Sequence, residues 1–99
     1  MVDIKSNTPH SSAVNGDLLA RIKHAAKHGQ VRFSRHALER AKERNVRRED
    51  VKNAIATATN ATPQEQGTAL VTGGTGLDGE ALSLACVEVQ EGLFVVTVF

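Results

Sequence analysis

The chain has 99 residues, of which 40% are hydrophobic and 23% are charged, enough for one modest core and too few for two domains. No run of 18 apolar residues occurs, and residues 1–16 lack the apolar stretch of a signal peptide, so the sequence predicts a cytoplasmic protein without a membrane span. Cys86 is the single cysteine and lies in the apolar run LSLACVEV. We therefore expect a buried thiol, no zinc or other metal site and no cofactor.

The net charge of +1 conceals an uneven distribution along the chain. Residues 21–52 hold eleven of the twelve Lys and Arg against four acids, a local charge of +7, whereas the remainder carries −6. A concentrated basic segment is typical of proteins that bind a phosphate-rich partner. Solvated basic helices and binders of acidic proteins show the same pattern, so both alternatives stay open.

Residues 1–14 are polar and aperiodic and predict a flexible N-terminal tail, which leaves residues 15–99 as a single α+β domain. Apolar residues then recur at helical spacing (Leu18, Leu19, Ile22, Ala25 and Ala26). They predict a helix over about 17–28, with Asp17 or Asn15 as its N-cap and Gly29 at its end.

A short strand is expected over 30–33, with Val31 and Phe33 on one face and Ser34 as the N-cap of a second helix. On that helix the sequence SRHALERAKERN places Ala37, Leu38 and Ala41 on the core side. Three side chains four residues apart form a cationic stripe along the border of this side: His36, Arg40 and Arg44. A third helix is predicted from the apolar spacing over residues 51–58, with acids at its positive end.

After Asn60 the segments 68–72, 82–89 and 93–99 are rich in Val, Leu, Thr and Phe and predict an antiparallel meander. Helices followed by strands indicate an α+β fold, with the N-terminal helices packed on one face of an antiparallel sheet of about four strands. The last strand is apolar on both faces and is expected in the middle of the sheet or beneath a partner. The sequence GTGLDG matches the dinucleotide pattern G-x-G-x-x-G but leads into a strand, so a hairpin turn is the better interpretation.

The order of features resembles a bacterial family of small uncharacterised domains. The resemblance covers about residues 31–99 and depends on FSRHALERAKERNV, a Val-x-x-Ala-Ile helix and the terminal VVTVF. That family is grouped with the RelE-like, MqsR-like and barnase-like ribonucleases of the BECR fold and is often encoded beside zinc-ribbon antitoxins. The resemblance implies a RelE/barnase-like fold and a toxin-like, metal-independent endoribonuclease, with RNA (including ribosome-associated mRNA) and a cognate antitoxin as partners.

Metal-free RNA cleavage needs a base, an acid and cations that hold the phosphate. His36 is the candidate base or acid, Arg40 and Arg44 are the candidate phosphate ligands, and the resemblance adds the Thr97 hydroxyl. Six further cations are expected to bind RNA: Lys23, Lys27, Arg32, Arg35, Arg47 and Arg48.

Structural roles compete with each of these assignments. His36 could bond a backbone carbonyl, the arginines could make weak helical pairs with Glu39 and Glu43, and Thr97 could be a polar break in a strand. His24 and His28 could supply a second proton donor, or lie on a solvated face. The chain has no Tyr or Trp and nothing basic after Lys52, and its three phenylalanines (Phe33, Phe94 and Phe99) are expected in the core. The alternative function is a non-catalytic module that binds nucleic acid or an acidic protein through the same basic helices.

Overall fold

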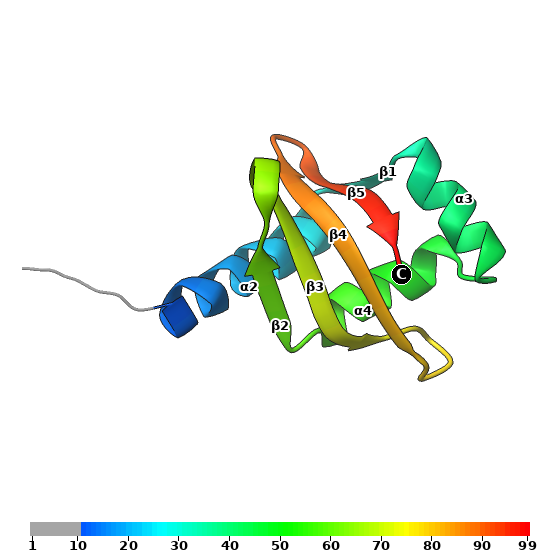
Figure 1. Ribbon diagram of the computed structural model, residues 1–99, viewed down its shortest axis with the longest axis horizontal. Coiled ribbons are helices and arrows are strands. Elements are labelled where there is room, and N and C mark those ends of the chain that lie inside the picture. Colours follow the sequence, from blue (N-terminus) through cyan, green and yellow to red (C-terminus); the bar gives the residue numbers. More distant parts are fainter. Residues whose placement is uncertain (1–10) are drawn as a thin grey trace, which may run out of the picture.

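The computed structural model describes residues 11–99, with side-chain burial from Gly16 onward. One sheet of five strands runs through the molecule in the order β1-β5-β4-β3-β2, and α2 and α4 lie behind it in the view of Figure 1. The helices are α2 (Ser11–His28), α3 (Arg35–Glu43) and α4 (Arg48–Thr57). The strands are β1 (Gln30–Phe33), β2 (Asn60–Pro63), β3 (Thr68–Thr75), β4 (Ala81–Val89) and β5 (Gly92–Val98), with a 3-10 turn η1 (Glu65–Gly67) before β3.

The α+β prediction is confirmed, with two differences in the sheet. It has five strands instead of about four, and β1 pairs with β5 in parallel, from Gln30 opposite Gly92 to Phe33 opposite Val95. The missed strand, β2, has the sequence NATP, which is poor in β-forming residues. It is an edge strand that pairs with β3, and an edge is the place where a strand tolerates Pro63.

Helix α2 begins at Ser11, so the predicted start at Asp17 is wrong and residues 11–14 are helical. Serine is compatible with a helix start, and nothing between Ser11 and Asp17 forces the chain out of the helix. The rest of the predicted tail, residues 1–10, lies outside the described residues. The helix ends as expected at Gly29, whose N–H donates to the carbonyl of Ala25 at 2.9 Å.

The loop with the glycine pattern is a hairpin turn between β3 and β4, as predicted. Gly74 lies against α4, and a Cβ at this position would collide with the carbonyl oxygen of Ala54. The first turn of α4 also holds the hairpin: Asp50 accepts hydrogen bonds from the N–H groups of Arg47 and Leu77, each at 2.9 Å. These two bonds, that from Arg47 most of all, hold the pKa of the Asp50 carboxyl below its usual value.

The core lies between the sheet and the helices. Strand β5 is inside the sheet, as predicted, and its Leu93, Val95 and Val98 are fully buried with Ile22 of α2 and Ile55 of α4. A register shift at Ala85 and Cys86 of β4 inserts one extra residue on β5, so that Val95 and Val98 both face the helices. Cys86 is buried as expected, and burial raises the pKa of its thiol to about 12.

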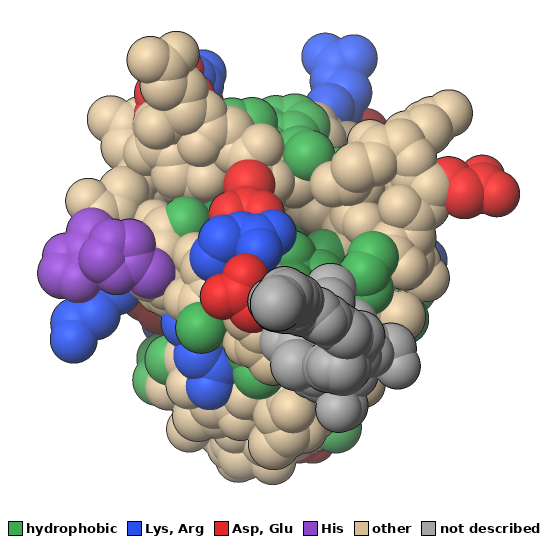
Figure 2. Space-filling view, turned by 90° about the vertical axis from the view of Figure 1, so that its left-hand side faces the viewer, with side chains coloured by type: hydrophobic (Ala, Val, Ile, Leu, Met, Phe, Trp, Pro, Cys, Tyr) green, Lys and Arg blue, Asp and Glu red, His purple; other side chains and the backbone are tan. Residues whose placement is uncertain are grey.

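At the end of the molecule shown in Figure 2, α2 is joined to the sheet by charges. Arg21 makes ion pairs with Asp17 at 2.9 Å and with Glu88 of β4 at 3.0 Å, and a basic side chain between two acidic ones is visible at the centre of this view. A patch of histidine is visible beside them in the same view. On α2, the ring centres of His24 and His28 lie 4.5 Å apart. Both side chains are exposed to solvent, as the structural alternative expected.

Candidate functional site

The first turn of α3 is fixed to the end of β5 by Ser34. Its N–H donates to the carbonyl of Val95 at 3.0 Å, and its Oγ donates to the carbonyl of Val96 at 2.7 Å. The same Oγ accepts from the N–H of Ala37 at 2.9 Å, which is the predicted N-cap. His36 follows Ser34 by two residues and Thr97 follows Val96, so both belong to one region, which we call the α3–β5 corner.

The cationic stripe is only partly assembled at this corner. His36 is exposed, and Arg40 is half-buried with its Nη1 3.3 Å from Oε1 of Glu43, which is the weak helical pair that the structural alternative described. Arg44 lies two turns from His36, about 12 Å along the helix axis. It lines a small cavity together with three acids, Asp50, Asp78 and Glu80, and is therefore poorly placed for a phosphate near His36.

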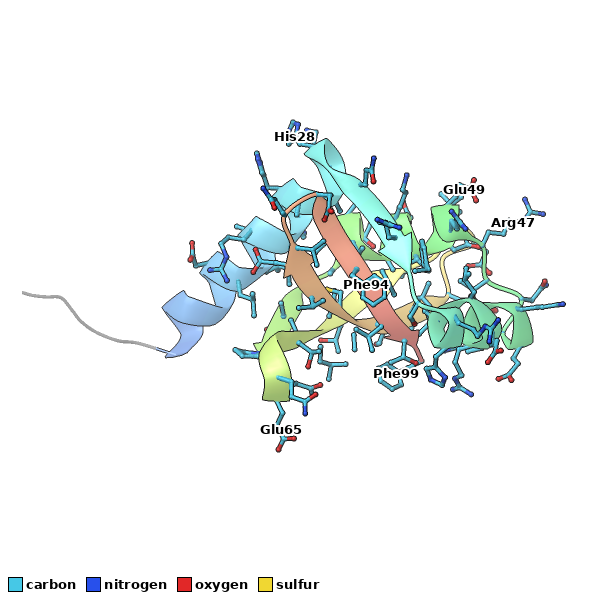
Figure 3. All side chains as sticks on the ribbon, turned by 90° about the horizontal axis from the view of Figure 1, so that it is seen from above. His28, Arg47, Glu49, Glu65, Phe94 and Phe99 are labelled. Carbon is cyan, nitrogen blue, oxygen red and sulfur yellow. The ribbon has the colours of Figure 1, made fainter. Side chains whose placement is uncertain are left out.

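Thr97 is half-buried and pairs with Ala85, on the face of the sheet opposite α2 and α4. Phe94 is half-buried on this same face, paired with Val87, and Phe99 is 48% exposed beyond the end of β5 (Figure 3). The expectation that both aromatic rings lie in the core is therefore wrong. It holds for Phe33, which packs against the core from β1.

Lysines from two helices surround a cavity of about 360 Å³ between α2 and α4. Lys23 and Lys27 come from the last turns of α2 and Lys52 from the middle of α4, above a floor of apolar side chains. That floor is made by Ala26, Ile55 and Ala56. The arrangement joins two predicted RNA-binding lysines with a third that the sequence analysis did not assign.

A second cavity, of about 340 Å³, lies between α3 and α4. Its floor is apolar (Phe33, Leu38, Ala41 and Val46), and its remaining lining residues are polar or basic (Lys42, Asn45, Arg47 and Arg48). The guanidinium carbon of Arg48 lies 5.5 Å from the centre of the Phe33 ring, within the range of a cation–π contact. Leu38 is 41% exposed here, so its prediction as a core residue is wrong. The stripe of α3 that packs inward is narrow and consists of Ala37 and Ala41.

Arg48 lines the α3–α4 cavity and Lys52 lines the α2–α4 cavity, and these two cations are one turn apart on α4. We call the cationic lining of the two cavities, taken together, the basic groove; it consists of Lys23, Lys27, Lys42, Arg47, Arg48 and Lys52. Among the residues that the structure describes, no acidic side chain lines either cavity and no ion pair involves these six cations. Arg47 and Glu49 project at one end of this side of the molecule, and His28 at the other (Figure 3).

Four of the six predicted RNA-binding residues thus lie in the basic groove. The other two, Arg32 and Arg35, are exposed and line neither cavity. Arg32 is opposite Phe94 in the β1–β5 pairing, and so lies on the sheet face away from α2 and α4. Lys42, Lys52 and Leu38 were not predicted from the sequence as functional residues; the i,i+4 spacing of Arg48 and Lys52 was the one signal in the sequence for a shared face.

The other cavities offer less chemistry. The largest, about 620 Å³, lies beside η1 and is lined by Gln64, Glu65, Gln66 and Thr68, without a cation or an aromatic ring. Within residues 11–99 no group of three or more His, Cys, Asp or Glu is placed to hold a metal ion. In the same part of the chain, no helix is long and apolar enough to cross a membrane.

The fold and the site define a small α+β domain with helices on one sheet face and a cationic groove between those helices. The chain belongs to the family described as the domain of unknown function DUF4258, whose model matches residues 33–99. No curated protein and no solved structure matches the chain significantly. The family match carries no link to RelE-like or MqsR-like ribonucleases, which stays a prediction.

Proposed function

We propose that this protein binds RNA through the basic groove. The observation that supports the proposal is the lining of the two cavities: six cations without an acid, above apolar floors. A cation without an acidic partner can bind a phosphate without first breaking an ion pair. Each such contact releases a condensed counterion from the RNA, which favours binding. The apolar floors suit the faces of nucleobases.

The charge of the rest of the chain also supports RNA binding at the basic groove. Outside residues 21–52 the chain carries seven acids and one lysine, so a polyanion is repelled from most of the surface and attracted to the helices. An acidic protein would be steered in the same way, and the experiment must separate the two partners.

Binding can be measured by fluorescence anisotropy with a labelled single-stranded RNA between about 50 and 200 mM salt. If all six cations contact phosphates, the plot of log affinity against log salt should have a slope of about −4. The triple variant Lys23→Gln, Lys27→Gln, Lys52→Gln should weaken binding and reduce the slope by about 2.

The matched control is Arg44→Gln, which removes a cation that already faces three acids and should change RNA affinity little. A loss of RNA affinity in Arg44→Gln as large as that in the triple variant would contradict the proposal. So would binding that does not depend on salt, or a preference for an acidic peptide such as polyglutamate over RNA.

The α3–β5 corner supports a second candidate, a toxin-like endoribonuclease that works without metal. The supporting observation is the anchoring of α3 by Ser34, which brings His36 to the end of β5 that carries Thr97. His36 would take the proton of a 2′-hydroxyl as that oxygen bonds to phosphorus; the bond from phosphorus to the 5′-oxygen would break, and water would protonate the leaving 5′-oxygen. Arg40, one turn further on, would stabilise the charge on the phosphate. In that role a cognate antitoxin would cover this corner in the cytoplasm.

Cleavage can be assayed on labelled RNA in EDTA, with growth after expression in a bacterial host as a second readout. His36→Ala should slow cleavage by about 100-fold or more without weakening RNA binding, because His36 lines neither cavity of the basic groove. His28→Ala is the control, since this exposed histidine is the last residue of α2 and does not belong to the α3–β5 corner. Intact RNA after incubation with the wild type, or an unchanged rate for His36→Ala, would exclude this candidate.

A further inference from the structure

We infer that the cavity between α3 and α4 receives one unpaired nucleobase of a single-stranded RNA. This inference rests on the proposed RNA binding and adds which form of RNA is recognised and where. Its starting point is that the two cavities of the basic groove differ in their chemistry. The α2–α4 cavity offers lysines above small aliphatic side chains, whereas the α3–α4 cavity offers an aromatic ring, two arginines and an amide.

The size and floor of the α3–α4 cavity suit one flat apolar group. Its volume of about 340 Å³ is at the small end of the range for ligand sites, roughly 300–1,000 Å³. Leu38 lies 41% exposed and Val46 half-buried along this floor. A base in contact with them would remove apolar surface from water, which a phosphate or a sugar would not do.

Arg48 supplies a planar surface for stacking. Its guanidinium carbon lies 5.5 Å from the centre of the Phe33 ring, so two planar groups are neighbours in this cavity. Guanidinium planes and aromatic rings are the groups on which proteins stack the unpaired bases of RNA. Arg48 is exposed to solvent, so its guanidinium is accessible to a base.

Polar groups at the edge of the cavity complete the recognition of a nucleotide. Asn45 follows the C-terminus of α3 with a φ of 59° and is exposed, and its amide can both donate to and accept from the edge of a base. Lys42 and Arg47 lie on either side of Asn45 along the chain and can bind the phosphates that flank the base.

A base can enter such a cavity only when it is unpaired and unstacked. In an A-form duplex the bases are stacked inside, and a protein reaches mainly phosphates and 2′-hydroxyls. A duplex could therefore contact the cations of the basic groove without filling the cavity. The geometry predicts a preference for single strands that charge alone would not produce.

The experiment compares three probes at equal phosphate number and fixed salt: a single-stranded RNA, the same sequence as a duplex, and inorganic polyphosphate, which has no bases. The wild type should bind the single strand about tenfold more tightly than either other probe, since stacking of one base contributes roughly 1–3 kcal/mol and 1.4 kcal/mol is a factor of ten.

Two substitutions test the cavity without changing its charge. Leu38→Ser and Arg48→Lys should each weaken binding of the single strand by about five- to tenfold and leave polyphosphate binding unchanged. Leu77→Ser is the matched control, because Leu77 is 65% exposed on the β3–β4 turn, and it should change neither affinity. Thermal melts of all three variants confirm that each remains folded.

The failures of the two proposals are distinguishable. Equal affinity for single strand, duplex and polyphosphate, with no effect of Leu38→Ser or Arg48→Lys, would overturn the base site and leave RNA binding through phosphates intact. An absence of binding to all three probes, or tighter binding to polyglutamate, would overturn RNA binding and the base site together.

Discussion

Ser34 follows β1 and links the first turn of α3 to β5 through one small side chain. Its hydroxyl donates to β5 and accepts from the first turn of α3, and its N–H donates to β5 as well. The position of His36 relative to Thr97 therefore depends on this residue more than on any residue of the cationic stripe itself.

Ser34→Ala should lower the free energy of unfolding by about 1–3 kcal/mol, because it removes an N-cap and leaves the Val96 carbonyl without its partner. Ser83→Ala is a matched control on β4, since no side-chain hydrogen bond of this half-buried serine is found among the described residues. It should stay within about 0.5 kcal/mol of the wild type. Urea denaturation followed by circular dichroism measures both, and similar losses for the two variants would contradict the role of Ser34.

For single residues, the sequence predicted those structural features that depend on residues close by in the chain. The N-cap at Ser34 and the shared face of Val31 and Phe33 follow from short-range geometry, and the structure has both. Leu38 was placed wrongly because the width of a buried helix stripe depends on what packs against it. The expectation for Phe94 failed because the sequence does not reveal that, among residues 11–99, no helix covers the face of the sheet on which Phe94 lies.

Besides the hydrogen bonds of Asn53 and Thr57 to the backbone at Thr75, α4 and the β3–β4 hairpin are joined at the carboxylate of Asp50 and at the backbone of Gly74. The carboxylate holds the turn at Leu77 to the first turn of the helix. The missing Cβ of Gly74 lets the strand approach the helix at Ala54. Each contact leads to a separate prediction.

Asp50 should make stability depend on pH in the acid range. Because its pKa is lowered in the folded state, its contribution is present above the unfolded pKa of about 4 and is lost as the pH falls through the folded value. Asp50→Asn should lower the melting temperature at pH 7, and the difference from the wild type should shrink as the pH falls below about 4.

Glu49→Gln is the control for Asp50. Glu49 is exposed in the same first turn of α4, and no hydrogen bond of its side chain occurs within the described part of the chain. Its substitution should leave this pH dependence unchanged. A constant difference between Asp50→Asn and the wild type across the acid range would contradict the assignment.

Gly74→Ala should destabilise the fold by about 1–3 kcal/mol, because the added methyl group meets the Ala54 carbonyl and forces β3 away from α4. Gly16→Ala is the opposite case: this glycine is helical, nothing lies within 4 Å of the position of its Cβ, and alanine should stabilise α2 by about 0.5–1 kcal/mol. Thermal melts compare the two, and a neutral Gly74→Ala would show that the close approach is not required.

Most helices and strands could be predicted from periodicity, whereas β2 and the true start of α2 could not. The sequence NATP has neither alternation nor β-branched residues apart from Thr62, and it is a strand because β3 provides hydrogen-bonding partners. The parallel pairing of β1 with β5 joins residues about sixty positions apart, which no local pattern encodes.

For the whole molecule, α2 contributes to the core although it lies outside the residues that the family model matches. The family model begins at residue 33, yet Ile22 of α2 is fully buried in the core and Leu18 lies beside it. Residues 33–99 on their own would expose the apolar surface that α2 covers.

Ile22→Ala should therefore lower the free energy of unfolding by about 2–5 kcal/mol, through lost burial and the cavity that remains. Leu77→Ala removes a similar side chain from an exposed turn and should cost less than about 0.5 kcal/mol. Chemical denaturation distinguishes them, and a small effect of Ile22→Ala would mean that α2 is dispensable for the core.

The basic segment was evident in the sequence, but the basic groove was not. The charge count assigned cations to residues 21–52 without indicating which of them share a surface. The groove exists because α2 and α4 pack on the same sheet face, which brings Lys23 and Lys27 beside Lys52. Equally, the sequence did not show that Arg44 differs from His36 in its surroundings, because the three acids beside Arg44 come from α4 (Asp50) and from the β3–β4 turn (Asp78 and Glu80).

The position of β5 between β1 and β4 has a consequence during protein synthesis. Until residues 92–98 have been made, the growing chain has no strand to join β1 to β4, and the core lacks Leu93, Val95 and Val98. Pairings between such distant segments form late, because the entropy of closing the loop must be lost first. On the ribosome, the helices that carry the basic groove should therefore be translated well before they can pack, and stable folding should begin when β5 leaves the exit tunnel.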